Sequence, residues 1–128
     1  MLADKFGAIA SRDEMIPFLL RRWRLIGIAS DHLTSVRGIN IPGSERAQRK
    51  DEFEAKFIEL AKKQIDEEGA QAIVPACFLF MPVLDPNARE RLEGILGVPV
   101  IHPHSLVVKF AEMMVTLKLR QSKKAYPK

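Results

Sequence analysis

The chain has 128 residues, a formal net charge of +4, and 47% hydrophobic and 28% charged residues. This length suits a single domain with its own core, so residues 1–128 are treated as one α/β domain. No apolar stretch is long enough to cross a bilayer, and residues 1–6 lack the apolar block of a signal peptide. A single cysteine suits a reducing compartment. We therefore expect a cytoplasmic protein without membrane contact.

The basic residues give no sign of nucleic-acid binding. They are spread over several predicted helices, where most alternate with acids as on a solvated surface. No aromatic residues interleave with them, and no zinc-ligand spacing accompanies them. We expect no nucleic-acid partner, no metal and no cofactor.

The first half of the chain predicts two strands and two helices. Residues 6–10 form a short apolar run, and Ser11 with Glu14 resembles a capping box that opens a helix. Pro17 is tolerated only in a first turn, which favours a helix start nearer to Met15. Residues 33–39 predict a second strand. The second helix has one apolar stripe and ends at Gly69; the stripe comprises Phe53, Phe57, Leu60, Ala61 and Ile65.

The second half repeats this alternation. Residues 70–76 are almost continuously apolar, as in a strand buried on both faces. Asp85-Pro86 predicts a helix start, Gly97 ends that helix near Leu96, and residues 98–101 predict a fourth strand. A last helix follows with a wide apolar face, and then a basic tail. Strands alternating with helices indicate a four-stranded parallel sheet, with a flavodoxin-like three-layer α/β/α architecture and strand order 2-1-3-4.

Four side chains are expected at the carboxyl ends of these strands, where open α/β sheets bind ligands. Cys77 follows the third strand and is either an acid/base thiol or a small buried hydrophobe. Ser11 follows the first strand, as a ligand contact, a helix cap or both. His102 and His104 follow the fourth strand, and either could hold a thiolate or simply complete the turn.

An ordered set of segments resembles the aspartate/glutamate/hydantoin racemase family over nearly the whole chain. The best match is Glu68-Gly69-Ala70-Gln71-Ala72-Ile73-Val74-Pro75-Ala76-Cys77. Similar segments are Arg12-Asp13-Glu14-Met15-Ile16-Pro17, Val36-Arg37-Gly38-Ile39-Asn40-Ile41-Pro42, Leu96-Gly97-Val98-Pro99-Val100-Ile101, Val108-Lys109-Phe110-Ala111-Glu112-Met113 and the tail from Leu119 to Pro127.

The resemblance implies a cofactor-independent racemase or isomerase. Family members have two similar α/β halves, and each half supplies one cysteine to an active site between them. One thiol removes the α-proton from one face of a carbon acid, and the other returns a proton to the opposite face. The implied substrate is an amino acid, a hydantoin or a related small carboxylic acid. Cys77 would be the thiol of this half, with Ser11, the backbone at Phe78 and His102 as substrate contacts.

This chain matches only the second, C-terminal half of the family pattern, which leaves several interpretations open. The first is a part of a longer racemase, the second is a chain that pairs with a second copy of itself, and the third is a single-cysteine relative such as a decarboxylase. A non-catalytic binding or assembly domain is a further alternative. Two departures bear on the choice: Ala76 replaces the usual glycine before the cysteine, and Phe78 replaces a small or hydroxyl-bearing residue. Phe78 favours a larger or more apolar acid over aspartate.

Overall fold

The structure is a computed structural model that describes residues 2–28, 31–80, 84 and 86–125. Three strands alternate with four helices: β1 (Phe6–Ala10), α1 (Ile16–Leu25), β2 (Leu33–Gly38), α2 (Lys50–Asp66), β3 (Ile73–Pro75), α3 (Pro86–Leu96) and α4 (Pro103–Thr116). Two short 3₁₀ helices follow strand ends, η1 (Asp13–Met15) and η2 (Phe78–Phe80). Each predicted helix is present. Asp85, the predicted cap of α3, lies outside the described residues.

The three strands form a parallel sheet of order β2-β1-β3. This agrees with the predicted order 2-1-3, but the predicted fourth strand is not formed. Val100 makes only an isolated parallel bridge to Ile73, next to backbone hydrogen bonds from Ile73 N to Pro99 O and from Ile101 N to Ile73 O, both 2.9 Å. Pro99 has no N–H to donate, and β3 is only three residues long, so the ladder cannot extend.

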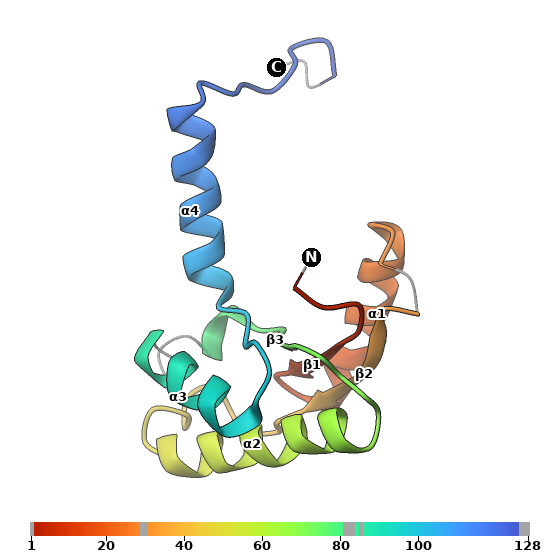
Figure 1. Cartoon of the computed structure of the whole chain (residues 1–128), viewed down its shortest axis with the longest axis vertical. Helices are drawn as coiled ribbons and strands as arrows, with labels where there is room; N and C mark the ends of the chain where they lie inside the picture. The colour runs from red at the N-terminus through yellow and green to blue at the C-terminus, as the bar shows by residue number, and fades with distance from the viewer. Residues whose placement is uncertain (1, 29–30, 81–83, 85, 126–128) are drawn as a thin grey trace.

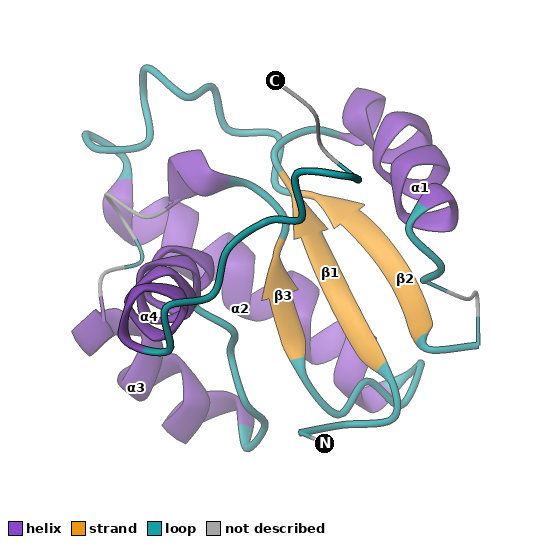
Figure 2. Cartoon of the chain, turned by 90° about the horizontal axis from the view of Figure 1, so that it is seen from above, coloured by secondary structure: helices purple, strands orange, loops and turns teal. Residues whose placement is uncertain are grey.

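The two faces of the sheet are covered by different helices. Side chains alternate along a strand, so Ile9 points to one face and Phe6 to the other. Ile9 packs in the main core with the α2 residues Phe53 and Phe57, whereas the Phe6 ring contacts Trp23 of α1 edge-on at 6.2 Å. Figure 2 shows α2 behind the sheet, and α1 and α3 beyond its opposite edges. A parallel sheet with helices packed against it (Figure 2) agrees with the predicted α/β class.

The start of α1 differs from the predicted capping box. Arg12 is the N-cap of η1, and no side chain caps it. The helix itself begins at Ile16 with Pro17 in its first turn, as the position of the proline indicates. Ser11 therefore does not cap this helix, because its hydroxyl is used elsewhere.

The last helix stands away from the rest of the molecule. In Figure 1, α4 rises from the sheet and its helices and carries the C-terminal segment with it. None of its described residues is buried, and Phe110 is 58% exposed. Among the described residues, no helix is both long and apolar enough to cross a membrane.

Candidate active site

Ser11 and Cys77 occupy equivalent positions at the ends of neighbouring strands. Ile9 of β1 is paired with Pro75 of β3. Ser11 lies two residues after Ile9, and Cys77 lies two residues after Pro75. The Ala76 N–H donates to the Ile9 carbonyl at 2.8 Å, which continues the pairing to the strand ends. Adjacent strands are about 4.8 Å apart, so the strand ends that precede Ser11 and Cys77 lie next to one another. These ends lie at the edge of the sheet where ligands bind in open α/β folds (Figure 2).

Cys77 is a free thiol at the margin of the core. Its side chain is partly buried and packs against the main hydrophobic cluster without being enclosed by it. Its carbonyl accepts the Phe80 N–H at 3.1 Å, so the chain turns into η2 directly after the cysteine. The cysteine thus lies between the end of β3 and a hydrogen-bonded turn, and it is only partly buried.

Ser11 is bound to an arginine that the sequence did not single out. The Arg46 Nη2 donates to the Ser11 Oγ at 2.6 Å, and the Arg46 Nε donates to the Ile41 carbonyl at 3.0 Å. The guanidinium lies over the Phe80 ring, with its central carbon 5.0 Å from the ring centroid. The sequence offered only one signal for Arg46, its place soon after the second strand, and many arginines in this chain are on the surface.

The loops around Ser11 are joined by a second network that sequence reasoning also missed. The Asp13 carboxylate accepts from the Gly38 N–H at 2.9 Å and from the Asn40 Nδ2 at 2.8 Å. The Asp13 N–H in turn donates to the Asn40 Oδ1 at 3.0 Å. Asn40 has a φ of 58°, in the left-handed region that asparagine tolerates better than most residues. This network fixes the segments after β1 and β2 against one another.

Phe78 extends the site toward the start of α4. Its ring is 56% exposed and stacks on His104, with centroids 4.7 Å apart. His104 is therefore paired with an aromatic ring. Phe78 and Leu79, which is 67% exposed, follow Cys77 directly in the chain and form an exposed apolar edge.

His102 caps α4 with its ring. The Ser105 N–H donates to its Nδ1 at 3.1 Å, so the ring proton lies on Nε2 and is donated to the Leu84 carbonyl, also at 3.1 Å. The Ser105 hydroxyl also lies 2.6 Å from Nδ1. Within the described part of the chain, the hydrogen bonds of this imidazole go to Ser105 and Leu84 and not to Cys77. His102 borders the strand ends but holds a turn in place.

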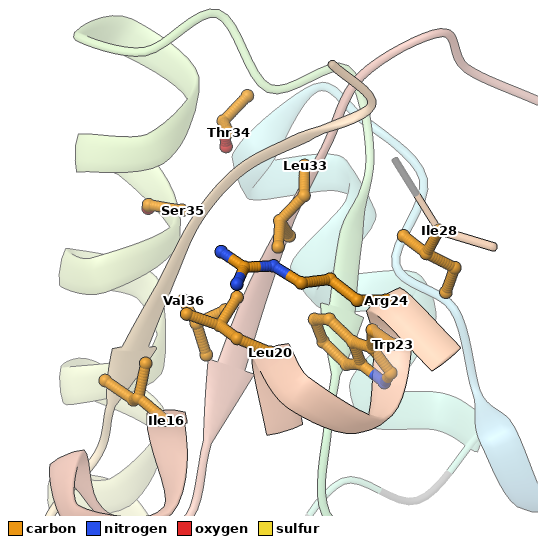
Figure 3. A pocket seen from close by; sticks show the side chains of 9 residues that line it. All are labelled: Ile16, Leu20, Trp23, Arg24, Ile28, Leu33, Thr34, Ser35 and Val36. Atoms are coloured by element: carbon orange, nitrogen blue, oxygen red, sulfur yellow. The ribbon is translucent and has the colours of Figure 1, made fainter. Parts of the chain in front are cut away.

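Other features of the structure lie apart from this site. A cavity of about 280 Å³ lies between α1 and the first half of β2, with Trp23 and Leu33 in its wall (Figure 3). Cys77 follows the carboxyl end of β3, and the cavity lies nearer to the opposite, amino end of the parallel strand β2. In the described ranges, no group of three His, Cys, Asp or Glu side chains is placed to hold a metal ion.

Comparison with known proteins agrees with this architecture. No protein-family model matches the chain. A hydantoin racemase from Rhizobium meliloti is 32% identical over 99% of the chain. An allantoin racemase from Klebsiella pneumoniae has 27% identity and a TM-score of 0.73 over 96% of the chain. The crystal structure of an allantoin racemase from Pseudomonas fluorescens has a TM-score of 0.82 over 95% of the chain at 24% identity, and so supports the fold.

These matches define the class first: the chain has the α/β fold of racemase domains. They also confirm the resemblance found in the sequence and support membership of the aspartate/glutamate/hydantoin racemase family. The matched relatives are named as racemases, and racemases are enzymes. The chain spans 52% of the hydantoin racemase, and 49% and 48% of the two allantoin racemases.

Proposed function

We propose that this chain is one half of a cofactor-independent racemase or isomerase, in which Cys77 transfers a proton at the α-carbon of a small carbon acid. The observation that carries the proposal is that a partly buried cysteine follows β3, which is paired with the strand that precedes Ser11. Ser11 and the backbone N–H of Phe78 hold the carboxylate or ring carbonyl of an amino acid, hydantoin or related acid. His102 borders the substrate from the α4 side.

A thiol suits this chemistry because its ordinary pKa, near 8.5, is close enough to neutrality for both protonation states to be reached. As thiolate, Cys77 removes the α-proton, and the electron pair moves into the adjacent carbonyl. As thiol, it returns a proton to the same face. Inversion needs a second acid on the opposite face, and this chain has no second thiol for that role because Cys77 is its only cysteine.

The second group comes from another α/β half. The relatives are about twice as long as this chain, so their length accommodates two such units. The apolar edge formed by Phe78 and Leu79 lies beside the cysteine, and the apolar side chains of α4 are exposed. Both surfaces suit contact with that half, and the basic tail serves as a tether. We place the assembled protein in the cytoplasm, where a free thiol stays reduced.

Hydrogen exchange in deuterated water tests the cysteine assignment. Single enantiomers of 5-substituted hydantoins and α-amino acids are incubated with the full chain, and deuterium at the α-carbon and optical rotation are followed by NMR and polarimetry. We expect exchange above the spontaneous rate with retained configuration, since one thiol works on one face. Cys77→Ala should abolish exchange while leaving the circular dichroism spectrum unchanged, and Ser35→Ala serves as the matched control. Exchange by the Cys77→Ala variant at the parent rate would refute the assignment.

A binding or assembly domain without turnover is the second candidate. The observation in its favour is Phe78, whose large exposed ring occupies the place where the family pattern has a small residue. Exchange of the α-proton separates the two. A catalytic chain exchanges the α-proton of a bound acid in a Cys77-dependent manner, whereas a binding domain binds the acid without exchange. A single-cysteine decarboxylase would instead release carbon dioxide from a disubstituted malonate in a Cys77-dependent manner.

The identity of the second half is tested by mass in solution. Analytical ultracentrifugation of the chain alone and with a separately produced first half distinguishes a heterologous partner from a second copy. We expect the mixture to form a 1:1 complex that inverts its substrate. A stable homodimer that inverts substrate by itself would assign the partner role to a second copy.

A further inference from the structure

Arg46 is a buried cation at the carboxyl edge of the sheet, and none of the described acidic residues pairs with it. The residue is 2% exposed, and its hydrogen bonds go to the neutral Ser11 hydroxyl and the Ile41 carbonyl. Its Nη1 is buried and has no hydrogen-bond partner within the described part of the chain. Among the described residues, no carboxylate forms an ion pair with this guanidinium, whereas Arg37, Arg49 and Arg91 each pair with at least one.

An unpaired buried charge is costly, because desolvation of the ion costs several kcal/mol that only an opposite charge or full hydrogen bonding repays. The Nε and Nη2 of Arg46 each donate a hydrogen bond, but these bonds go to neutral groups and do not neutralise the positive charge. The Phe80 ring adds a cation–π contact that offsets part of the cost. The remaining deficit lies at the edge of the sheet where α/β folds bind ligands, so an anionic ligand would supply the missing charge.

Ser11 is the reachable end of this pair. The serine is half-buried, and its oxygen accepts from Arg46, so its hydroxyl hydrogen remains available for another acceptor. An acceptor bound to Ser11 would also lie close to the guanidinium charge. Arg46 thus acts through Ser11, as a positioning residue that orients the hydroxyl and favours a negatively charged acceptor.

We infer that Ser11 and Arg46 form a carboxylate subsite, and that the substrate of this chain is an anionic carbon acid and not a neutral ring. The inference rests on the proposed function and narrows its substrate class. In this arrangement the Ser11 hydroxyl donates to the substrate carboxylate, Arg46 supplies the counter-charge, and the reacting carbon is presented to the Cys77 side of the strand ends.

A pair of probes that differ in charge tests the inference. The full chain is titrated with 2-phenylpropanoate and with 2-phenylpropanamide, and binding is followed by NMR shifts of the backbone amides. We expect the carboxylate to bind about tenfold more tightly, as is typical of a hydrogen bond to a charged group. Arg46→Met should remove this preference, and Arg46→Lys should retain part of it. Arg12→Met, which removes an exposed cation next to Ser11, should leave the preference intact.

Two results would overturn the subsite. The first is equal binding of the two probes, or binding of neither, by the parent chain. The second is a folded Arg46→Met variant that still prefers the carboxylate. If that variant does not fold, Ser11→Ala answers the same question, because it removes the donor and leaves the guanidinium in place.

The proposed acid/base role of Cys77 can fail independently. Cys77→Ala should keep the preference for the carboxylate probe while losing α-proton exchange. If exchange is unaffected by Cys77→Ala but the charge preference depends on Arg46, the subsite stands and the thiol assignment is wrong. If the charge preference is independent of Arg46 but exchange depends on Cys77, the reverse holds.

Discussion

Similar apolar side chains are buried in one region of the molecule and exposed in another. The first region is the sheet with α1 to α3, and the second is the last helix, α4. Phe53 and Phe57 of α2 are fully buried between the sheet and the segment after β3, and Phe53 meets Phe80 edge-on at 5.1 Å. Phe110 on α4 is 58% exposed, and Val115 is 78% exposed. Figure 1 shows the same contrast in the backbone, with α4 projecting from a packed body. An apolar helix face therefore shows that a surface is to be covered, but not which element covers it.

This difference has a thermodynamic consequence for the isolated chain. The sheet with α1, α2 and α3 is called the body. The body buries its own apolar surface and supplies the stability of the fold. The α4 face gains nothing from folding within the described chain, so its contribution awaits a partner. Substitutions in the two regions should therefore have opposite signatures: those in the body change the free energy of unfolding, and those on α4 change association.

The largest effect is expected for Phe53→Ala. The substitution leaves a cavity between α2 and Phe80, and it should lower the free energy of unfolding by about 3–5 kcal/mol. Phe110→Ala is the matched control on α4, where the change should stay within about 0.5 kcal/mol. Urea unfolding followed by the fluorescence of Trp23, the only tryptophan, measures both. Equal losses in the two variants would show that α4 packs on the body and would remove the contrast.

A smaller effect is expected at the end of β2, where the site loops meet the body. A Cβ added to Gly38 would lie 2.4 Å from the backbone nitrogen of Asp13, and the backbone cannot yield as a side chain would. Gly38→Ala should cost about 1–3 kcal/mol by overpacking. It should also displace the segment that carries Ser11.

Gly94 provides the control for this prediction. It lies in α3, and a Cβ added there would have no neighbouring atom within 4 Å, so Gly94→Ala should stabilise the helix by about 0.5–1 kcal/mol. Opposite signs for the two variants would show that the strand ends are tightly packed and the helix surface open. A neutral Gly38→Ala would mean that the loops after β1 and β2 are freer than their hydrogen bonds indicate.

The elements of the body were predictable because local and tertiary preferences agree there. The predicted α2 stripe is amphipathic at helical spacing, and the structure buries it except for Ile65, which is partly buried. The prediction of a fourth strand was wrong, because the run around Pro99 is apolar enough for a buried strand but lacks the N–H that a longer ladder needs. The capping role of Ser11 was wrong because a tertiary partner, Arg46, takes its hydroxyl.

The site was predictable only in part, for the same reason. The strand-end rule predicts from sequence alone that Ser11 and Cys77 lie at the same edge of the sheet, and the parallel pairing of β1 with β3 brings the ends of those two strands together. The contributions of Arg46 and Asn40 come from loops that fold back onto the strand ends. No periodicity marks such residues, so only the tertiary structure identifies them.

The smallest expected effect on the free energy of unfolding comes from an ion pair. The Arg37–Glu68 pair lies in the body, and the Lys109–Glu112 pair on α4 is its counterpart. Burial alone would raise the pKa of Glu68, but the Ser35 hydroxyl and the Arg37 guanidinium hold this pKa below its usual value. A carboxylate with a lowered folded pKa stabilises the protein above its unfolded pKa, about 4.3, and this stability is lost as pH falls through the folded value. Glu68→Gln should therefore cost about 0.5–1 kcal/mol at pH 7, and the difference from the parent chain should shrink below about pH 4.3.

The pair on α4 should show no such dependence. Lys109 and Glu112 are 2.8 Å apart, but both side chains are largely exposed, so solvent screens their attraction. Glu112→Gln should leave the unfolding transition of the body unchanged at both pH values, since α4 is not packed against it. Urea midpoints of the two variants at pH 7 and pH 3.5 measure the contrast. A pH-dependent loss for Glu112→Gln as large as that for Glu68→Gln would place α4 within the cooperative unit and would contradict the division between body and last helix.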